Sequence, residues 1–350
     1  FGRNTIGGAV LLTTALPGDE LGGTVRVGVG DDDLREAFVA VDLPIADGLG
    51  ARISAGARQR DGYVTRIHDN MDLGDEDSFT TQAVLRWETD PVTLTLRGDY
   101  TREDENGSPF VFAAINESQV FPIFASVAAG CSNGAGAPSF PPPVPVPQDL
   151  VDPRCANDAT WNLGKYTNGG TAPAFSRLEN WGTSLVAEFK LSDAFRLKSI
   201  SAYRELNWHG ARDADNTPLT ILHTDYKSDG RQFSEELQGL VETDRLKGVF
   251  GLFYFDEKVT DFLQVPIAAG VGAPAQVLQG SRDYQLAYLD NENWAVFTQW
   301  TYDITDALSV TAGVRYTEET KGARIIGFTT APVDAPTIVP DFLRPYTIYA

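Results

Sequence analysis

The sequence predicts an all-β protein, and more narrowly an antiparallel β-barrel that crosses a membrane. Three observations lead there. Apolar and polar residues alternate along many short segments, short and long connections alternate between those segments, and no convincing amphipathic helix occurs. A period of two places successive side chains on opposite faces of a strand. The chain has no apolar run of about 18 residues, but a barrel crosses with alternating strands and leaves no such peak.

The predicted strands carry apolar residues on one face and polar residues on the other. In the segment 51–60, for example, Ala51, Ile53 and Ala55 alternate with Arg52 and Ser54. Segments 79–88, 92–101 and 308–317 alternate as cleanly, whereas 197–208 does not sort onto two faces. In chain order we predict eleven strands, and a twelfth that starts at Tyr346: 23–30, 36–43, 51–60, 79–88, 92–101, 181–191, 197–208, 232–241, 249–256, 294–302 and 308–317.

The connections fall into two kinds that alternate along the chain. The short ones are 44–50, 88–91, 191–195, 242–247 and 304–308, and most contain a Ser/Thr-Asp pair that favours tight turns. The long ones are approximately 61–78, 103–180, 209–231, 261–292 and 321–345. Outer-membrane barrels have short periplasmic turns and long external loops. A soluble sandwich has no reason to keep its long loops at one end, and a propeller requires a fixed period.

Aromatic residues gather near the ends of the predicted strands. Amphipathic rings at both interfaces form the girdles of membrane barrels. We therefore predict that girdles contain Trp87, Tyr100, Trp181, Trp294, Trp300, Tyr302 and Tyr316. The alternative is that these are ordinary strand aromatics in a soluble core.

Charge and cysteine content restrict the class of protein further. The chain has 28 Lys plus Arg and 48 Asp plus Glu, which gives a net charge of −20. Such a chain repels phosphate backbones, so we expect no nucleic-acid partner. Cys131 and Cys155 lie in the longest loop, about 103–180, and we predict a disulfide between them in an oxidising compartment. The alternative is two unrelated thiols.

No catalytic or metal-binding signature stands out. The sequence has no nucleophile elbow, Walker loop, HExxH motif or dinucleotide fingerprint, so we expect no enzyme and no cofactor. The acidic runs 31–33 and 69–77 lack the spacing of a calcium loop. His68, His209 and His223 fall in or beside predicted long loops, and three scattered imidazoles are weak support for an iron or haem site.

The opening stretch "FGRNTIGGAV", followed by "LLTT", resembles the end of the plug domain of TonB-dependent outer-membrane receptors. The residues that carry this resemblance are Gly2, Arg3, Asn4, Gly7 and Gly8. Further similar segments are "SAYRELNW" (201–208), "QFSEELQGL" (232–240), "GLFYFDE" (251–257) and "FTQWTYDITDALSVTAGVRYTEE" (297–319).

The resemblance implies a barrel of about 22 strands filled by an N-terminal plug. Residues 1–16 would then be the C-terminal remnant of the plug, and 22–350 the N-terminal half of the barrel. The chain would be a fragment truncated at both ends. Half a barrel has two unpaired edges, so we expect a curved, open or imperfectly closed antiparallel sheet.

The resemblance also implies a function. Such receptors bind scarce, large solutes outside the cell, and TonB supplies the energy for import. We expect a multi-pass barrel in the outer membrane of a Gram-negative bacterium, with TonB, outer-membrane lipid, lipopolysaccharide and a solute such as a ferric siderophore as partners. The alternatives are a passive porin-like channel, or a receptor for an oligosaccharide or vitamin. A passive pore has no reason to carry the plug motif.

One ion pair between plug and barrel follows from the same resemblance. Arg3 stands where plug arginines of this family face the barrel wall, and Glu236 lies on the polar face of its predicted strand. A partly desolvated arginine–carboxylate pair could gate the plug. The alternative is two solvated charges in the lumen.

Overall fold

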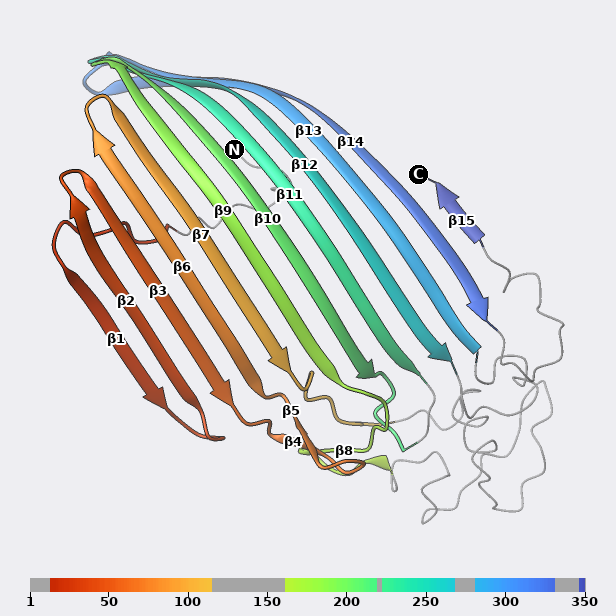
Figure 1. Cartoon of the computed structure of the whole chain (residues 1–350). Helices are drawn as coiled ribbons and strands as arrows, with labels where there is room; N and C mark the ends of the chain where they lie inside the picture. The colour runs from red at the N-terminus through yellow and green to blue at the C-terminus, as the bar shows by residue number, and fades with distance from the viewer. Residues whose placement is uncertain (1–12, 115–160, 219–221, 268–280, 331–345, 350) are drawn as a thin grey trace, which may run out of the picture.

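One curved antiparallel sheet of twelve strands makes up most of the computed structural model (Figure 1). The structure describes residues 13–114, 161–218, 222–267, 281–330 and 346–349. Every strand of this sheet pairs with its neighbour in sequence order, and β1 and β15 form the two edges. The expectation of an open, all-β antiparallel sheet is therefore confirmed.

The strands lengthen along the chain from 8 residues in β1 to 25 in β13, whereas β15 has only 4. Their bounds are β1 Gly22–Val29, β2 Arg35–Ala46, β3 Leu49–Arg60, β6 Glu76–Thr89, β7 Val92–Glu105, β9 Phe175–Ser192, β10 Phe195–Asp213, β11 His223–Glu242, β12 Leu246–Ile267, β13 Ser281–Thr305, β14 Leu308–Thr330 and β15 Tyr346–Tyr349. No helix in the described ranges is long and apolar enough to cross a membrane.

Several strands extend far into segments that the alternation pattern assigns to loops. The predicted loops 209–231 and 261–292 are wrong in extent, because β10 continues to Asp213 and β12 to Ile267. His209 and His223 are consequently strand residues. Toward the long connections, charged side chains occupy both faces of these strands. The apolar–polar alternation therefore stops there, although the hydrogen-bond ladder between the strands continues.

Short turns and long connections lie at opposite ends of the sheet, except that the short connection 30–34 between β1 and β2 lies at the same end as the long ones. In Figure 1 the turns β2–β3, β6–β7, β9–β10, β11–β12 and β13–β14 all lie at the upper left. The β2–β3 turn requires Gly48, whose φ is +68° and whose position would put a Cβ 2.1 Å from the carbonyl oxygen of Glu88. We call the two ends the short-turn end and the long-loop end.

The register places each strand residue on one of two faces. Arg52, Arg97, Arg204 and Arg315 share the face that we call inner, and the other face, outer, carries most of the apolar side chains. The side chains of Ala40, Val84, Asn293 and Ala295 are each at most 2% exposed, and all lie on the inner face. Side chains converge on this face, as expected for the concave side of a curved sheet.

A second, smaller sheet lies at the long-loop end. Its strands are β4 Val64–Arg66, β5 Met71–Leu73 and β8 Thr167–Asn168. β4 pairs with β5 in antiparallel fashion and with β8 in parallel. The sequence pattern does not predict this sheet, because strands of two or three residues are too short to show a period.

Candidate functional site: the inner wall and the loop cluster

Ion pairs connect neighbouring strands across the inner face. Arg52 pairs with Asp42 at 2.5 Å and Lys198 pairs with Glu188 at 2.8 Å. Arg58 pairs with both Glu36 and Glu76. A wall of alternating charges suits contact with water or with a polar partner, and it does not suit contact with hydrocarbon.

The longest of these bridges spans three strands. The guanidinium of Arg204 donates to both carboxylate oxygens of Asp99, at 2.9 and 2.8 Å. In the register Gly182 of β9 stands between them, and a Cβ there would lie 2.8 Å from the Arg204 guanidinium carbon. The absence of a side chain at Gly182 is what lets the arginine reach across.

We expect Gly182→Leu to break the Arg204–Asp99 bridge and to lower the free energy of unfolding slightly. The two side chains are 38% and 26% exposed, so the bridge contributes about 1 kcal/mol or less. Arg204→Gln should cost a similar amount, and the two changes together should cost less than their sum. Urea titration of the single and double variants measures this, and strict additivity would contradict it.

An arginine lies among aromatic rings elsewhere on the inner face. The guanidinium of Arg315 lies 5.6 Å from the ring centres of both Phe253 and Phe297. Its Nε donates to the Thr317 hydroxyl at 3.0 Å, while its buried Nη1 has no hydrogen-bond partner among the described residues. Glu236 is the register partner of Phe253 on β11. Together these residues form a strip across β11–β14, which we call the inner-wall strip.

The long connections near β4 fold against one another around a small apolar core. Val64, Leu73 and Ala174 are buried together, with Met71 and Val111 packed against them. Nearby, Trp161 is 1% exposed and meets the Phe112 ring edge-on at 5.7 Å. We call this unit, formed by residues 61–75, 106–114, 161–174 and 213–218, the loop cluster.

Two buried polar side chains tie the segments of the loop cluster together. Arg66 is 3% exposed, donates to the carbonyl oxygen of Ala172, and pairs with Asp69. Asn168 is 1% exposed and donates to the carbonyl oxygen of Phe110 at 2.8 Å. Asn168 also donates to the side chain of Asn216 at 2.8 Å, which adds the fourth segment.

Asp213 connects two segments of the loop cluster through four hydrogen bonds. Its side chain is 4% exposed. One oxygen accepts from the backbone amides of Thr171 and Ala172 at 2.8 and 3.0 Å. The other accepts from the amides of Asp215 and Asn216 at 3.1 and 2.7 Å. A single carboxylate thus satisfies four backbone donors from two segments that are about forty residues apart.

Asp213, Asp215 and His223 lie close enough together to be considered as metal ligands. The two oxygens of Asp213 already accept the four amides described above. Those of Asp215 accept from the amides of Thr217 and Leu222 at 3.0 and 2.8 Å. A cation would have to displace these donors, so the arrangement is that of a structural joint.

Asp215 should make the loop cluster sensitive to pH. Burial, and next the neighbouring charge of Asp213, raise the pKa of Asp215 from 3.8 to about 6. Between about pH 3.8 and about pH 6, the folded loop therefore holds a proton that the unfolded loop has released. Its stabilising contribution is complete below about pH 3.8 and is lost as the pH rises through about 6.

Hydrogen exchange at Thr217 and Leu222, corrected for the intrinsic rate, should show the opening free energy falling between pH 4 and 7. Asp215→Asn, which cannot ionise, should flatten that profile. A wild-type profile that is already flat would contradict the shift.

The predicted girdle residues all lie on the outer face. They form two groups along the strands. The group nearer the long-loop end contains Tyr100, Trp181, Trp294 and Tyr316, and the group near the short turns contains Trp87, Trp300 and Tyr302. In the first group the rings of Trp294 and Tyr316 lie 5.6 Å apart, and Trp181 lies 5.5 Å from the ring of Tyr203, a further aromatic residue of the outer face. That these rows mark membrane interfaces stays a prediction.

The other predicted site residues are only partly covered. The plug motif at residues 2–8, including Arg3, lies outside the described residues, and so do Cys131 and Cys155. Glu236 lies on the inner face and accepts from the Gln238 amide at 2.6 Å. The Arg3–Glu236 pair and the disulfide therefore stay predictions.

Sequence reasoning missed the residues that hold the loop cluster together. The run Asp213-Ala-Asp-Asn is one available signal, because Asp and Asn side chains commonly accept from backbone amides two or three residues further on. No comparable local signal marks Arg66 or Asn168, whose partners are distant in the chain.

Comparison with known proteins places this fold in a family. Residues 132–332 match the family described as TonB dependent receptor-like, beta-barrel. This match covers more than half of the chain, and the chain therefore belongs to that family, as the resemblance implies.

Individual relatives are consistent with this placement. The chain is 31% identical over 111 residues to the ferrioxamine B receptor of Salmonella typhimurium (strain SL1344), a match that covers 31% of the chain and 15% of that protein. It superposes on the ferric yersiniabactin uptake receptor FyuA from Yersinia pestis with a TM-score of 0.68 at 14% identity, covering 96% of this chain and 43% of that one.

A further solved structure is the ferripyoverdine receptor of the outer membrane of Pseudomonas aeruginosa. The TM-score is 0.53 at 13% identity, over 96% of this chain and 39% of that chain. At such identities the likeness shows the fold. The chain spans less than half the length of these relatives.

Proposed function

We propose that the chain is part of an outer-membrane receptor that binds a ferric siderophore outside the cell and imports it into the periplasm with energy from TonB. The observation that carries this proposal is the match to the TonB-dependent receptor barrel over residues 132–332. The name of the curated relative, ferrioxamine B receptor, supports an iron complex as the solute. Membership of this family also supports a transport role and argues against catalysis.

The two faces of the sheet support a barrel wall with a polar interior. Arginine, lysine and carboxylate side chains pair on the inner face, while the outer face exposes large apolar residues such as Leu252 and Val314. In the proposed receptor the short turns face the periplasm. The loop cluster then lies outside the cell, where it would meet the arriving solute.

The domain assignment is part of the same proposal. Residues 1–16 form the end of the plug, and residues 22–350 form the first half of the barrel. Cys131 and Cys155 join within an external loop, which would restrict the freedom of that loop. The inner-wall strip, with Glu236 and Arg315, is the part of the wall that we assign to contact with the plug.

Uptake in cells tests the function directly. A strain that lacks the full-length gene should lose growth on ferrioxamine B under iron limitation, and the restored gene should rescue growth only where TonB is present. Uptake of labelled ferrioxamine B without TonB would indicate a passive channel. If the deletion strain grows normally with every ferric siderophore but poorly on a sugar or vitamin, the transported solute is that sugar or vitamin and not an iron complex.

A charge swap tests the Arg3–Glu236 pair. In the intact receptor, Arg3→Glu and Glu236→Arg should each lower siderophore uptake about tenfold, the equivalent of about 1.4 kcal/mol. The double swap should restore most of it, because the pair is re-formed with the charges exchanged. Unchanged uptake in the single variants would show that both residues are simply solvated charges of the lumen.

A further inference from the structure

The chain is attached to the inner face of the sheet before its first strand begins. Residues 13–21, which we call the entry segment, have no helical or strand structure and lead into β1 at the short-turn end. The backbone amide of Gly18 donates to one carboxylate oxygen of Asp42 at 3.1 Å. The other oxygen accepts from Arg52 at 2.5 Å. A single side chain of β2 therefore connects the entry segment to β3.

Asp42 also meets the first residue of β1. In the register it is the partner of Gly22, so its backbone lies beside Gly22 while its side chain holds Gly18, four residues earlier. Residues 19–21 bend between these two contacts. The stretch from Gly18 to Gly22 is therefore folded back on one residue, and it cannot be pulled straight unless the hydrogen bond from Gly18 to Asp42 breaks.

Gly50 gives the entry segment room to approach β3. A Cβ at Gly50 would lie only 3.1 Å from the Cβ of Pro17, so a side chain there would push the segment away. Pro17 has no backbone N–H. Gly18 thus presents the first amide after this contact, and the carboxylate of Asp42 accepts from that amide.

Among the described residues, apolar packing contributes little to holding the entry segment. Leu16 and Leu21 have exposed fractions of 40% and 74%. A cavity of about 660 Å³ is lined by residues 16–19 and by the β2–β3 turn, so the segment passes over a hollow there. The Asp42 and Arg52 side chains, by contrast, are only 14% and 21% exposed, and salt screens such a pair less than an exposed one. The attachment therefore depends mainly on this polar joint.

We propose that Asp42 is a positioning residue, which anchors the entry segment at Gly18 and so sets the point where TonB-driven movement of the plug ends. A pull on the plug reaches the barrel along the chain. Without the anchor, the pull would act on the first pair of the β1 ladder, Gly22 and Asp42, and would separate the following pairs one after another. With the anchor, the load passes from Gly18 through Asp42 to Arg52, and β2 and β3 carry it together. The inference rests on the proposed function, because TonB supplies the pull.

Hydrogen exchange of the full-length receptor tests the anchor without TonB or solute. Asp42→Ala should speed exchange of the Gly18 amide about fivefold, the equivalent of one hydrogen bond of about 1 kcal/mol. The exchanged pair Asp42→Arg/Arg52→Asp should regain the stability of the barrel in urea, because the ion pair is re-formed. It should not regain the protection of Gly18, because an arginine side chain has no acceptor. If the exchanged pair protects Gly18 as well as the wild type does, the carboxylate of Asp42 is not the anchor.

TonB-dependent uptake tests what the anchor does. Asp42→Ala, and Gly50→Val, which displaces Pro17, should each lower the maximal rate of ferrioxamine B uptake. The half-saturating concentration should stay the same, because the solute is captured at the long-loop end. The matched control is Asp99→Ala, which removes an inner-face carboxylate of β7 that pairs with Arg204. Unchanged maximal rates in both test variants, or an equal loss in the control, would overturn the role of the anchor.

The two measurements separate this inference from the proposed function. If the wild-type receptor takes up no ferric siderophore with TonB present, the proposed function fails, and the exchange of the Gly18 amide alone then decides whether Asp42 holds the entry segment. If the wild type transports the siderophore and Asp42→Ala transports it at the same maximal rate, the role of the anchor fails and the proposed function stands.

Discussion

Asp213→Ala is expected to release the loop cluster while leaving the large sheet intact. The substitution removes the acceptor of four backbone amides, two from residues 171–172 and two from 215–216. Each buried donor left unpaired costs about 1–3 kcal/mol. Even with water entering, a local loss of about 3 kcal/mol follows, so amide protection at Thr171 and Asn216 should fall by roughly a hundredfold.

Hydrogen exchange of the full-length receptor measures this release. The control is Asp193→Ala, because Asp193 is fully exposed in a short turn and its one ion-pair partner among the described residues is Lys190. Protection in β9 and β10 away from the joint should stay the same in both variants. If Asp213→Ala leaves the amides of residues 171–172 protected, the cluster is held by its apolar core around Val64 and not by this carboxylate.

The same variant links the loop cluster to the proposed function. If the cluster contributes to capture of the solute, Asp213→Ala should weaken siderophore binding while assembly of the barrel continues. Binding that persists with a released cluster would restrict the role of these loops to covering the barrel.

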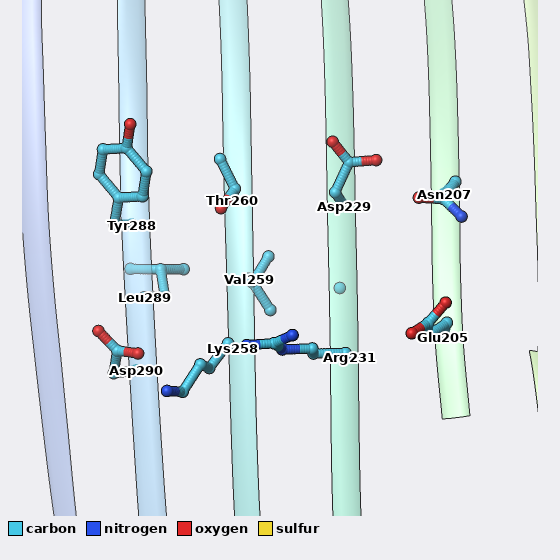
Figure 2. Close-up of a pocket in the computed structure, with 11 residues that line it drawn as sticks. Glu205, Asn207, Asp229, Arg231, Lys258, Val259, Thr260, Tyr288, Leu289 and Asp290 are labelled. Carbon is cyan, nitrogen blue, oxygen red and sulfur yellow. The ribbon is translucent and has the colours of Figure 1, made fainter. Parts of the chain in front are cut away.

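The sheet is predictable from the sequence where the two faces meet different environments. Segments such as 51–60 and 308–317 alternate because one face is apolar and the other carries Arg52 or Arg315. Nearer the long-loop end, the outer face is no longer apolar, and it carries Asp229, Arg231 and Lys258 (Figure 2). The pattern therefore stops before the strands end, and the lengths of β10–β13 could not be predicted.

The loop cluster could not be predicted, for a different reason. Its contacts join residues far apart in sequence, as in the hydrogen bond from Arg66 to Ala172, which are 106 positions apart. No periodicity in the sequence predicts such a contact, since each partner has the local sequence of an ordinary loop residue. The inner-wall strip could be predicted only in part. The alternation along each strand predicts that Arg315 and Glu236 lie on the polar, inner face, but it does not predict the strand register that brings them together in one strip across β11–β14.

Ala83→Arg is expected to have the largest effect on the stability of the assembled barrel. Ala83 is exposed on the outer face of β6, midway between Phe79 and Trp87. If this face meets lipid, an arginine there lies near the middle of the bilayer and lowers the free energy of unfolding by about 2–4 kcal/mol. Urea unfolding of the full-length receptor in lipid bilayers measures the loss.

The adjacent residue provides a control on the same strand. Gln82 points to the inner face and is the register partner of Asp99, so Gln82→Arg introduces the same side chain beside a carboxylate. It should change stability by less than about 1 kcal/mol. If the face of Ala83 were instead an exposed surface of a soluble protein, both arginines would be tolerated. If it packed into a protein core, Ala83→Arg would prevent folding even in detergent. A loss that depends on the lipid, and appears at residue 83 but not at residue 82, distinguishes a membrane wall from both alternatives.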